Sequence, residues 1–337
     1  MLSVSIIIVT WNALHHLKEY LPSVVKNSND AEIIIADNAS DDGTGEWLKA
    51  TFPQVKHFLM KKNHGYCGGN NRSASSATGD IIVFLNNDVE VSENWLEPIR
   101  EKFEENENTA VVQPKILDYQ NRSYFEYAGA AGGKMDRLGY PFCRGRLFDT
   151  LEEDHGQYDD SDTLAWASGA AFAIRKKLFF KIGQFDERFE FHMEEIDLCW
   201  RLMNMGYEIK YAPKSVAFHL GGGSLKTGSS RKIYYNYRNS LLMLLKNTPK
   251  GLAFKRIFLR LNLDGVAGVR ALLQGRPMET IAIIKAHFGF YSKFRSVSKT
   301  RKILLNARKS KKDPKPIYSK LIIWQYFIKG KKRYSEL

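Results

Sequence analysis

Three clusters of polar residues each follow an apolar run that is typical of a buried strand. They are Thr10-Trp11-Asn12 after Val4–Val9, Asp37–Thr44 at the end of Glu32–Asp37, and Asn86-Asn87-Asp88 after Ile81–Leu85. Any one of them could be ordinary turn chemistry. In an open parallel sheet, however, ligands bind outside the carboxyl ends of the strands, so three clusters at one edge indicate a ligand site.

Two carboxylates in these clusters suit the parts of a nucleotide. Asp37 ends an apolar strand, where its carboxylate can accept the N3–H of a uracil or thymine ring. Asp88 lies at the equivalent point of a later strand, where it can hold a divalent metal that neutralises a diphosphate. Between them, the predicted Gly-rich loop Asn63–Asn71 would let the backbone approach a ligand closely, although a plain turn is an equal interpretation.

Glu194-Glu195-Ile196-Asp197 opens a predicted helix. Acidic residues are common in a first helical turn because they favour the helix dipole, and Asp197 stands four residues before Arg201, the spacing of a structural ion pair. Two adjacent carboxylates after a Phe-rich segment could instead include one whose pKa is raised by its surroundings. A general base needs such a pKa.

His219 ends another apolar strand, just before Gly221-Gly222-Gly223-Ser224. A lone His is more often structural than a metal ligand, yet a strand-end His beside a Gly-rich loop is a better metal candidate than most. The sequence has no Gly-x4-Gly-Lys-Ser/Thr motif, and no Gly-x-Gly-x-x-Gly after its first strand. ATPase and dehydrogenase functions therefore lose support.

Strands that alternate with helices over the first 115 residues predict a doubly wound, mainly parallel α/β sheet that positions these clusters. Asn12 is expected to cap a helix with apolar residues from Leu14 to Val25. Residues 116–165 break into irregular pieces, and order returns at Leu164–Arg175. The other predicted elements are strands at Val55–Met60, Tyr207–Tyr211 and Ser215–Phe218, and helices at Ser92–Glu104 and Glu194–Gly206.

Composition narrows the class of protein. The chain has 337 residues, 44% of them hydrophobic, which excludes a wholly disordered chain. No apolar run reaches the roughly 18 residues of a membrane span, and no basic leader or cleavage site precedes Val4–Val9. Cys67, Cys143 and Cys199 are odd in number and far apart, which fits a reducing cytosol and offers no disulfide framework or zinc site. The expected location is cytoplasmic.

Charge divides the chain into two parts. Residues 231–337 hold 26 Lys and Arg against 4 Asp and Glu, whereas residues 1–230 hold 24 against 33. The net charge of +13 thus combines an acidic body with a strongly basic third, whose expected partner is a polyanion. No zinc finger, RNP motif or other nucleic-acid module is present, so an anionic membrane surface is favoured over nucleic acid.

The basic third reads as helices that mix apolar and basic residues. Such segments suit the interface of an anionic membrane, and the tail over residues 296–337 is the expected anchor. Helices that pack on the body with a solvated basic face are the alternative. The segments are Phe254–Ala271, Thr280–Phe294, Arg301–Lys312 and Tyr318–Arg333.

The motifs in this order resemble glycosyltransferase family 2, the inverting enzymes of the GT-A fold, and in particular its rhamnosyltransferase-like branch. The matching stretches span about residues 3–240: VSIIIVTWN, IIIADNASDDGT, NHGYCGGNN, IVFLNNDVEV, ASGAAFAIRKKLF with GQFDERF, MEEIDLCWRL and HLGGGS. Tyr234-Tyr235-x-x-Arg238-Asn239 also resembles a recurring feature of this branch, either near the diphosphate or in structural packing.

The resemblance implies roles for individual residues. The implied nucleotide-sugar positions are Thr10, Asn12, Asp37, Asn38, Ser40, Asn63, Gly65, Asn70 and Asn87. Asp88 and His219 correspond to metal-binding positions, for Mn²⁺ or Mg²⁺. The implied sugar and acceptor pocket contains Trp166, Ser168, Gly169 and Ala170. Glu194 and Glu195 match a Glu-Asp pair whose second member is the catalytic base.

Two departures from the family pattern bear on the chemistry. The DxD-type motif begins with Asn86, so the metal would rely on Asp88, the diphosphate and His219. The base position holds Glu195 where Asp is usual, and a shift of about 1 Å can cost about 100-fold in rate. Either the pocket compensates, or Glu194 or Asp197 serves instead.

The resemblance implies an inverting transfer of rhamnose or a similar hexose from a dTDP- or UDP-sugar to a hydroxyl of a glycan or lipid-linked glycan precursor. The predicted domains are a catalytic domain over residues 1–230, with a nucleotide-sugar half to about residue 115 and an acceptor half beyond, and a basic helical region over 231–337. That region would place the enzyme peripherally on the cytoplasmic face of the membrane. The alternatives are a nucleotidyltransferase, whose Gly-rich N-terminal signature is absent, and an inactive scaffold that acts as a basic membrane-binding module.

Overall fold

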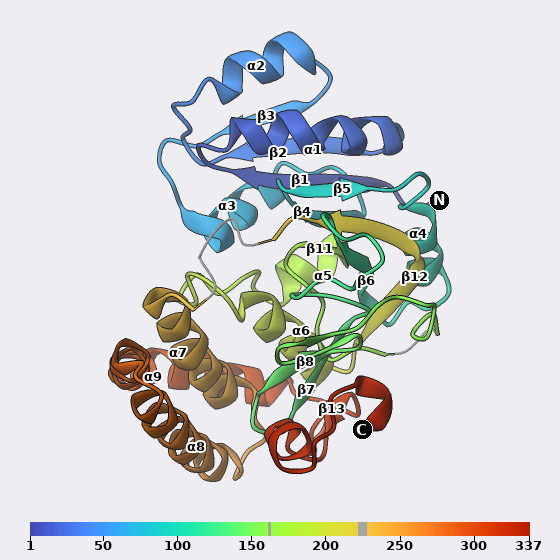
Figure 1. The fold of residues 1–337 in the computed structure, drawn as a ribbon. Coiled ribbons are helices and arrows are strands. Elements are labelled where there is room, and N and C mark those ends of the chain that lie inside the picture. Colours follow the sequence, from blue (N-terminus) through green and yellow to red (C-terminus); the bar gives the residue numbers. More distant parts are fainter. Residues whose placement is uncertain (161–162, 222–227) are drawn as a thin grey trace.

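The computed structural model describes residues 1–160, 163–221 and 228–337, and its described strands form two sheets (Figure 1). The main sheet has eight strands in the order β3-β2-β1-β4-β11-β6-β12-β5. Their bounds are Val4–Thr10 for β1, Glu32–Asp37 for β2, Lys56–Leu59 for β3, Ile81–Asn86 for β4, Val89–Val91 for β5, Thr109–Asp118 for β6, Ala171–Arg175 for β11 and Glu208–His219 for β12.

The polar clusters predicted to share one sheet edge do share it. β1 pairs in parallel with β2 and β4, and the register sets Thr10 beside Asp37 and Val9 beside Asn86. Beyond β4 the sheet is mixed, because β11 runs antiparallel to both β4 and β6 while β12 runs parallel to β6. The predicted α/β sheet is therefore confirmed, and its parallel part carries the clusters.

Helices cover both faces of this sheet, as the continuous apolar strands predict. Ile6 and Ile8 share an apolar core with side chains of α1 Leu14–Asn27, α2 Thr44–Thr51 and α4 Glu97–Glu104. Ile7 shares the opposite core with side chains of α3 Gly65–Ala74, α5 Lys176–Lys181 and α6 Glu194–Asn204, and with side chains of the three long helices of the basic third.

Some predicted element boundaries are wrong, for local reasons. Asn12 does not cap α1: it has a φ of 47°, and the N–H of Leu14 donates instead to Asp42 Oδ2 over 2.8 Å. α4 begins at Glu97 rather than near Ser92, with Pro98 in its first turn, where a missing N–H costs nothing. The two strands expected after α6 are one strand, β12, with a register shift between Ala212 and Val216.

The Gly-rich segment expected to be a loop forms helix α3. Its glycines allow close packing against the sheet edge. A Cβ on Gly69 would lie 3.0 Å from both Val9 Cγ1 and Asn38 Nδ2, and one on Gly68 would lie 2.8 Å from His64 Cβ. The helix can therefore approach the ends of β1 and β2 as no bulkier sequence could.

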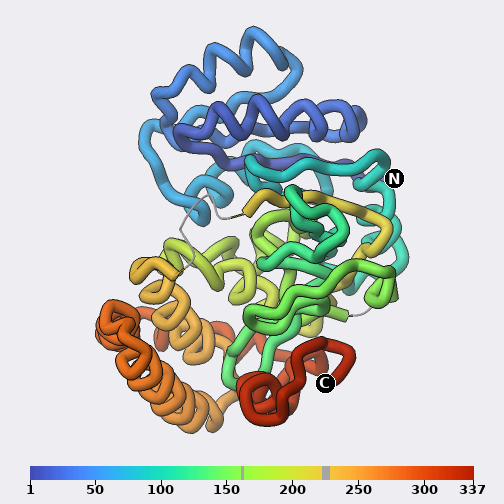
Figure 2. The backbone as a smooth tube through the Cα atoms, viewed as in Figure 1, coloured from blue at the N-terminus to red at the C-terminus, as the bar shows by residue number. Residues whose placement is uncertain are grey.

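A second, five-stranded sheet has the order β10-β9-β8-β7-β13. Its strands are β7 Gly133–Asp136, β8 Pro141–Cys143, β9 Arg146–Leu147, β10 Thr150–Leu151 and β13 Ile317–Tyr318. The last strand belongs to the C-terminal tail, which lies in red beside the green strands of this sheet in Figure 2. Ile322 and Tyr326 are buried there with Phe142 and Leu147. The tail is thus partly built into the body, with a π-helical turn at Trp324–Ile328 and a 3₁₀ turn at Tyr334–Glu336.

The basic third is largely helical, as predicted, with α7 Ser230–Asn247, α8 Ala253–Leu273 and α9 Pro277–Ala307 (Figure 1). Two predicted segments differ: Arg301–Lys312 is not a separate helix, because α9 runs on to Ala307 and ends there, and Tyr318–Arg333 contains a π-helical turn in place of a regular helix. Leu241–Leu245 of α7 are buried in the main core, so this helix joins α8 and α9 to the body. Among the described helices, none combines the length and the apolar character that a bilayer span requires. The division at residue 230 stays a prediction.

A buried polar network fixes α6 against α7. Asp197 is fully buried, and it accepts from Arg201 Nε, Lys246 Nζ and Asn247 Nδ2, each over 2.8 Å. Lys246 Nζ also donates to Asp186 Oδ2 over 2.7 Å. The predicted Asp197–Arg201 ion pair is therefore confirmed. All of these contacts give Asp197 a structural role.

We expect Asp197→Ala to destabilise the fold by about 3–5 kcal/mol, because it leaves the buried cations Arg201 and Lys246 without their shared carboxylate. Urea unfolding followed by circular dichroism measures this loss. Glu208→Ala, which removes an exposed partner of Lys210, is the control and should cost under about 1 kcal/mol. Equal small losses in both variants would contradict the anchoring role.

Candidate active site

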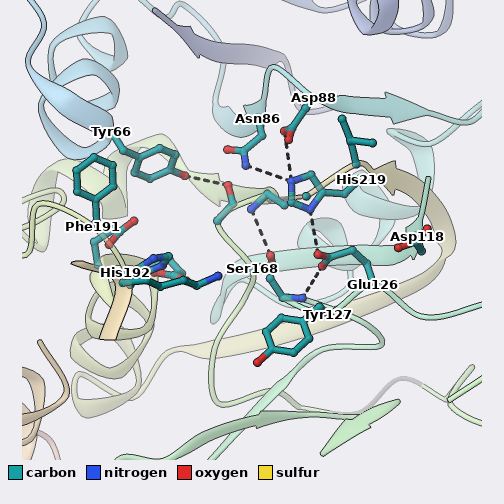
Figure 3. Close-up of a pocket in the computed structure, with 18 residues that line it drawn as sticks. Tyr66, Asn86, Asp88, Asp118, Glu126, Tyr127, Ser168, Phe191, His192 and His219 are labelled. Carbon is teal, nitrogen blue, oxygen red and sulfur yellow. Dashed lines mark hydrogen bonds and ion pairs between the residues drawn. The ribbon is translucent and has the colours of Figure 1, made fainter. Parts of the chain in front are cut away.

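A cavity of about 420 Å³ opens between the carboxyl edge of the sheet and the start of α6 (Figure 3). Its wall combines side chains from segments that are far apart in the sequence. They include Tyr66 of α3, Asn86 and Asp88 after β4, Glu126 and Tyr127, Ser168–Ala170 before β11, Phe191–His192, Glu194 and Glu195 of α6, and His219 at the end of β12.

His219 lies between two carboxylates at one end of this cavity. Its Nε2 is 3.3 Å from Asp88 Oδ1, and its Nδ1 is 3.3 Å from Glu126 Oε1. All three side chains are buried. Burial disfavours the imidazolium, but Glu126 and Asp88 outweigh burial and raise the pKa of His219 to about 10. Burial alone would raise the pKa of Asp88, yet the contact with His219 lowers it.

The donor set at this end fits a divalent cation. Asp88 Oδ1 and His219 Nε2 are separated by the spacing of neighbouring ligands that each lie about 2.1 Å from one ion. No group of three or more His, Cys, Asp or Glu side chains suited to a metal occurs in the described part of the chain. A cation here would therefore need further oxygen ligands from a bound molecule, as a diphosphate could supply.

Glu126 lies behind His219, where it can hold the imidazole of this donor pair in position. Besides facing His219 Nδ1, it accepts from the backbone N–H of Ala128 through Oε2 over 2.6 Å, which fixes the carboxylate. A carboxylate behind a metal-binding imidazole sets the orientation of the ring and its basicity. No motif in the sequence pointed to Glu126, which lies in the irregular segment after β6.

Glu194 and Glu195 lie at the other side of the cavity with raised pKa values. Burial raises the pKa of Glu195 to about 7, against backbone hydrogen bonds that lower it. Burial, and then repulsion from Glu195, raise the pKa of Glu194 well above its usual value. Glu194 is buried, whereas Glu195 is partly exposed, so Glu195 is the carboxylate that a bound molecule can reach.

Each carboxylate keeps one oxygen, Oε2, without a hydrogen-bond partner among the described residues. Tyr66 stands beside them, and its hydroxyl donates to the carbonyl of Gly169 over 2.9 Å. A Cβ on Gly169 would lie 3.4 Å from this hydroxyl oxygen and 3.9 Å from the Glu195 carboxyl carbon. The small residue therefore keeps the space in front of the Glu195 carboxyl group open. The two unpartnered Oε2 atoms are themselves buried, and a carboxylate in such surroundings can accept a proton.

The predicted nucleotide-sugar residues lie next to this cavity, along the ends of β1, β2 and β4. Asp37 is buried, with Oδ1 accepting from the N–H of Ser40 over 2.8 Å and Oδ2 lying 3.0 Å from His57 Nε2. Asn12 Oδ1 accepts from the N–H of Asp41 over 2.9 Å, and its own N–H donates to Ser40 Oγ over 3.0 Å. These bonds join the turns after β1 and β2.

The same edge is linked to the Gly-rich helix and to the turn after β4. Asn38 donates to the carbonyl of Gly65 over 3.2 Å, and Asn63 Oδ1 accepts from the N–H of Gly65 over 2.7 Å. Asn87 donates to Thr10 Oγ1 over 3.2 Å. Asn70 is buried and donates to the carbonyl of Tyr66 over 3.1 Å, so it holds α3 rather than facing the cavity.

The structure places the remaining predicted residues as follows. Ser168, Gly169 and Ala170 line the cavity, whereas Trp166 does not: it is buried against Gly133, and its Nε1 donates to the carbonyl of Lys134 over 2.7 Å. Asp197 is also outside the cavity, which leaves Glu194 and Glu195 as the carboxylates of this helix that face it. Gly222, Gly223 and Ser224 lie outside the described residues.

Arg238 and Asn239 prove to be packing residues. Asn239 Nδ2 contacts the carbonyls of Phe189, Phe191 and His192 over 2.6–2.9 Å, and Arg238 Nη1 donates to Glu190 over 3.1 Å. Both side chains are buried. They hold the loop that leads into α6, so the structural alternative for this motif is the one that the contacts support.

The sequence model for glycosyl transferase family 2 matches residues 5–181, more than half of the chain. The chain belongs to glycosyl transferase family 2. It is a glycosyltransferase, and this family assignment agrees with nucleotide sugars as the donors.

Curated relatives point to several sugars. The chain is 22% identical, over 80% of its length and 92% of the relative, to the N-acetylglucosaminyl-diphospho-decaprenol L-rhamnosyltransferase of Mycobacterium tuberculosis. It is 26% identical, over 71% of its length and 74% of the relative, to the low-salt glycan biosynthesis hexosyltransferase Agl10 of Haloferax volcanii. It is 28% identical to N-acetylgalactosaminyltransferase 6 of Drosophila melanogaster over 70% of its length, but it spans only 37% of that protein.

Solved structures confirm the GT-A fold. GalNAc-T7 with UDP, GalNAc and Mn²⁺ superposes with a TM-score of 0.61 at 17% identity, over 88% of this chain and 58% of that one. The mannosyltransferase PcManGT of Pyrobaculum calidifontis, in complex with GDP-Man and Mn²⁺, gives 0.52 at 16% identity, over 91% and 86%. At such identities the likeness extends to the fold alone.

The supporting role of Glu126 in the glycosyltransferase can be tested by metal binding. We expect Glu126→Ala to weaken the affinity for Mn²⁺ in the presence of UDP by about 10–100-fold, because His219 loses the group that orients it. Isothermal titration calorimetry measures this affinity. Glu90→Ala, at an exposed ion pair with Arg122, is the matched control and should leave it unchanged. Unaltered affinity in Glu126→Ala would remove the supporting role.

Proposed function

We propose that this glycosyltransferase moves rhamnose or a similar hexose from a dTDP- or UDP-sugar to a hydroxyl of a glycan or lipid-linked glycan precursor, with inversion. The observation that carries the proposal is that one cavity holds two kinds of group: the Asp88–His219 donor pair on one side and the Glu194–Glu195 carboxylates on the other. A leaving diphosphate needs the metal-binding pair, and an attacking hydroxyl needs a carboxylate that can accept its proton.

The carboxylate side suits proton removal. Glu195 reaches the cavity, has an oxygen without a partner, and has a pKa raised to about 7, close to the pH at which a general base works best. It would accept the proton of the acceptor hydroxyl as the hydroxyl oxygen bonds to the anomeric carbon and the bond to the diphosphate breaks. A single displacement inverts the anomeric centre, and no covalent enzyme intermediate is needed.

The other side suits diphosphate binding. Asp88 and His219 would hold Mn²⁺ or Mg²⁺, which when bound neutralises charge on the departing diphosphate. Glu126 keeps the imidazole in place, and Asp37 at the sheet edge would accept the N3–H of the pyrimidine. Support for rhamnose comes from the Mycobacterium tuberculosis relative, and support for UDP from the GalNAc-T7 complex.

An inactive scaffold is the less supported alternative. Burying two carboxylates without saturating their hydrogen bonds costs folding free energy, and packing alone would not favour it. Such costs are typical of positions kept for chemistry. The location expected for the protein, at the cytoplasmic face of a membrane, belongs to the same proposal.

The donor and the two sides of the cavity can be tested together. We expect a dTDP- or UDP-sugar with Mn²⁺ or Mg²⁺ to raise the melting temperature, since a ligand at 100 times its Kd adds about 2.7 kcal/mol of stability. Asp88→Asn should abolish this metal-dependent shift and lower donor turnover at least about 100-fold. Glu195→Gln should keep the shift but lose transfer to a similar extent. Glu208→Gln is the matched control on the surface. Full activity in both site variants would overturn the proposal.

The raised pKa of Glu195 predicts a pH profile. A base must be deprotonated to act, so kcat/KM should rise about tenfold per pH unit below about pH 7 and level off above it. An ordinary Glu would place this limb near pH 4.5. Initial rates between pH 5 and 9 with a fixed donor and acceptor measure the profile. A profile that is flat from pH 5.5 to 8 would assign the proton to another group.

A further inference from the structure

Helix α8 has the reverse of the pattern expected for a helix on a solvated surface. Its buried positions include the charged residues Arg256, Arg260 and Asp264. Its exposed positions include seven large apolar side chains, of which Leu273 is 84% and Phe254 is 74% exposed: Phe254, Phe258, Leu259, Val266, Val269, Leu272 and Leu273. A surface helix normally buries its apolar stripe and exposes its charges.

The buried charges of α8 are paired with specific neighbours, although Asp264 Oδ2 has no hydrogen bond and lies 3.5 Å from His287 Nε2. Arg260 Nε donates to Asp264 Oδ1 over 2.7 Å, its Nη1 donates to the carbonyl of Leu138 over 3.2 Å, and its guanidinium stacks 3.8 Å from the centre of the Tyr140 ring. Arg256 Nη1 donates to Asp313 over 2.9 Å. Rotating the helix to bury its apolar face would break all of these contacts. The exposed apolar face is therefore a consequence of specific packing.

Helix α9 continues this surface. Met278, Ile281, Ile284, Phe288 and Tyr291 are all exposed, with Phe288 at 72%, and their spacing of three or four residues sets them on one side of the helix. Further along, Arg295, Lys299 and Lys302 are exposed at the same spacing. The outward stripe of α9 thus changes from apolar to basic along its length.

The tail adds aromatic residues to the same region. Trp324, Phe327 and Ile328 are exposed, and the guanidinium of Arg270 on α8 lies 5.3 Å from the centre of the Phe327 ring. Of the 23 large apolar side chains that are exposed in the described part of the chain, 17 lie between Leu252 and Ile328. The catalytic body carries only six, which shows that exposure is concentrated here.

We propose that the outward faces of α8 and α9, together with Trp324, Phe327 and Ile328, bind the interface of an anionic lipid bilayer. The apolar side chains would enter the boundary between headgroups and acyl chains, and the exposed Lys255, Arg270 and Lys285 would lie at the headgroups. The buried faces, charged on α8 and apolar on α9, stay on the protein, so the helices would lie in the plane of the interface. The expected anchor thus shifts from residues 296–337 to residues 254–291 with Trp324, Phe327 and Ile328, because other tail residues, among them Ile322 and Tyr326, are buried against the second sheet.

Charge favours a bilayer over a second copy of the chain. Residues 231–337 hold 26 basic and 4 acidic residues, so two copies that met through this surface would bring like charges together. Anionic headgroups complement the same charges. Binding through these helices does not depend on the identity of the sugar or of the base, and it goes beyond the transfer reaction proposed above.

Vesicle flotation of the full chain tests this surface. We expect binding to vesicles with 30% phosphatidylglycerol, much weaker binding to pure phosphatidylcholine, and a decrease as salt rises. Phe258→Ser, Leu273→Ser and Phe288→Ser combined should lower the partition at least about 100-fold, because each change removes an apolar side chain from the interface. Since these side chains are exposed, the melting temperature should stay within a few degrees.

A matched triple variant controls for lost surface hydrophobicity. Leu59→Ser, Leu151→Ser and Phe180→Ser change exposed apolar side chains of the body and should bind vesicles as the unaltered chain does. Lys255→Glu, Lys285→Glu and Lys299→Glu combined should lose the preference for anionic lipid. Hydrolysis of the nucleotide sugar in solution should persist in all three variants, which separates this test from that of the active site.

Two outcomes would overturn the proposal. One is equal flotation of the unaltered chain and the Phe258, Leu273 and Phe288 variant. The other is absence of vesicle binding together with a dimer, seen by analytical ultracentrifugation, that dissociates in this variant, since a second copy of the chain would then cover the face.

Discussion

The candidate active site depends on how α7 holds the first turn of α6. Among the residues that the structure describes, none forms an ion pair with Glu194 or Glu195, so their position must be imposed by neighbouring structure. Asp197, one turn further along, supplies it through Lys246 and Asn247 of α7. Asn239, also on α7, holds the carbonyls of the preceding loop, in which Glu190, His192 and Met193 all have positive φ values. Helix α7, the first helix of the basic third, is therefore a structural support of the candidate site.

This dependence explains which features of the fold could be predicted from sequence. Continuous apolar runs predict the strands β1, β2 and β4, and polar residues follow each run directly. The shared sheet edge of Thr10, Asp37 and Asn86 could therefore be inferred from the sequence. Local signals were less reliable where tertiary packing decides. The Gly-rich α3 is helical because its glycines allow close approach to β1, which no propensity scale records.

The part of the site that sequence reasoning missed comes from the segment without periodicity. Glu126 stands between short, irregular pieces. It comes near His219 because its N–H donates to the carbonyl of Ile116 on β6, the strand that pairs with β12. Trp166, which the resemblance placed in the sugar and acceptor pocket, lies instead in the core against Gly133. In a regular strand Trp166 and Ser168, two residues apart, would share one face. The segment is not a regular strand, and the bridge between Trp166 and Gly133 holds the indole against the second sheet.

The inverted polarity of α8 links the catalytic and basic parts of the molecule. A helix that buries Arg260 and Asp264 leaves its apolar face in water and loses the free energy that burying this face would contribute. That free energy is recovered if the exposed face leaves water when the protein binds an interface. Exposed Phe and Leu side chains on a solvated helix would otherwise favour aggregation. Because α7 joins α8 and α9 to the loop before α6, an orientation imposed on these helices at an interface would also orient the mouth of the cavity. The proposed acceptors include lipid-linked precursors. For such an acceptor, this coupling would orient Glu195 toward the acceptor hydroxyl without any contact between the bilayer and the proposed catalytic residues.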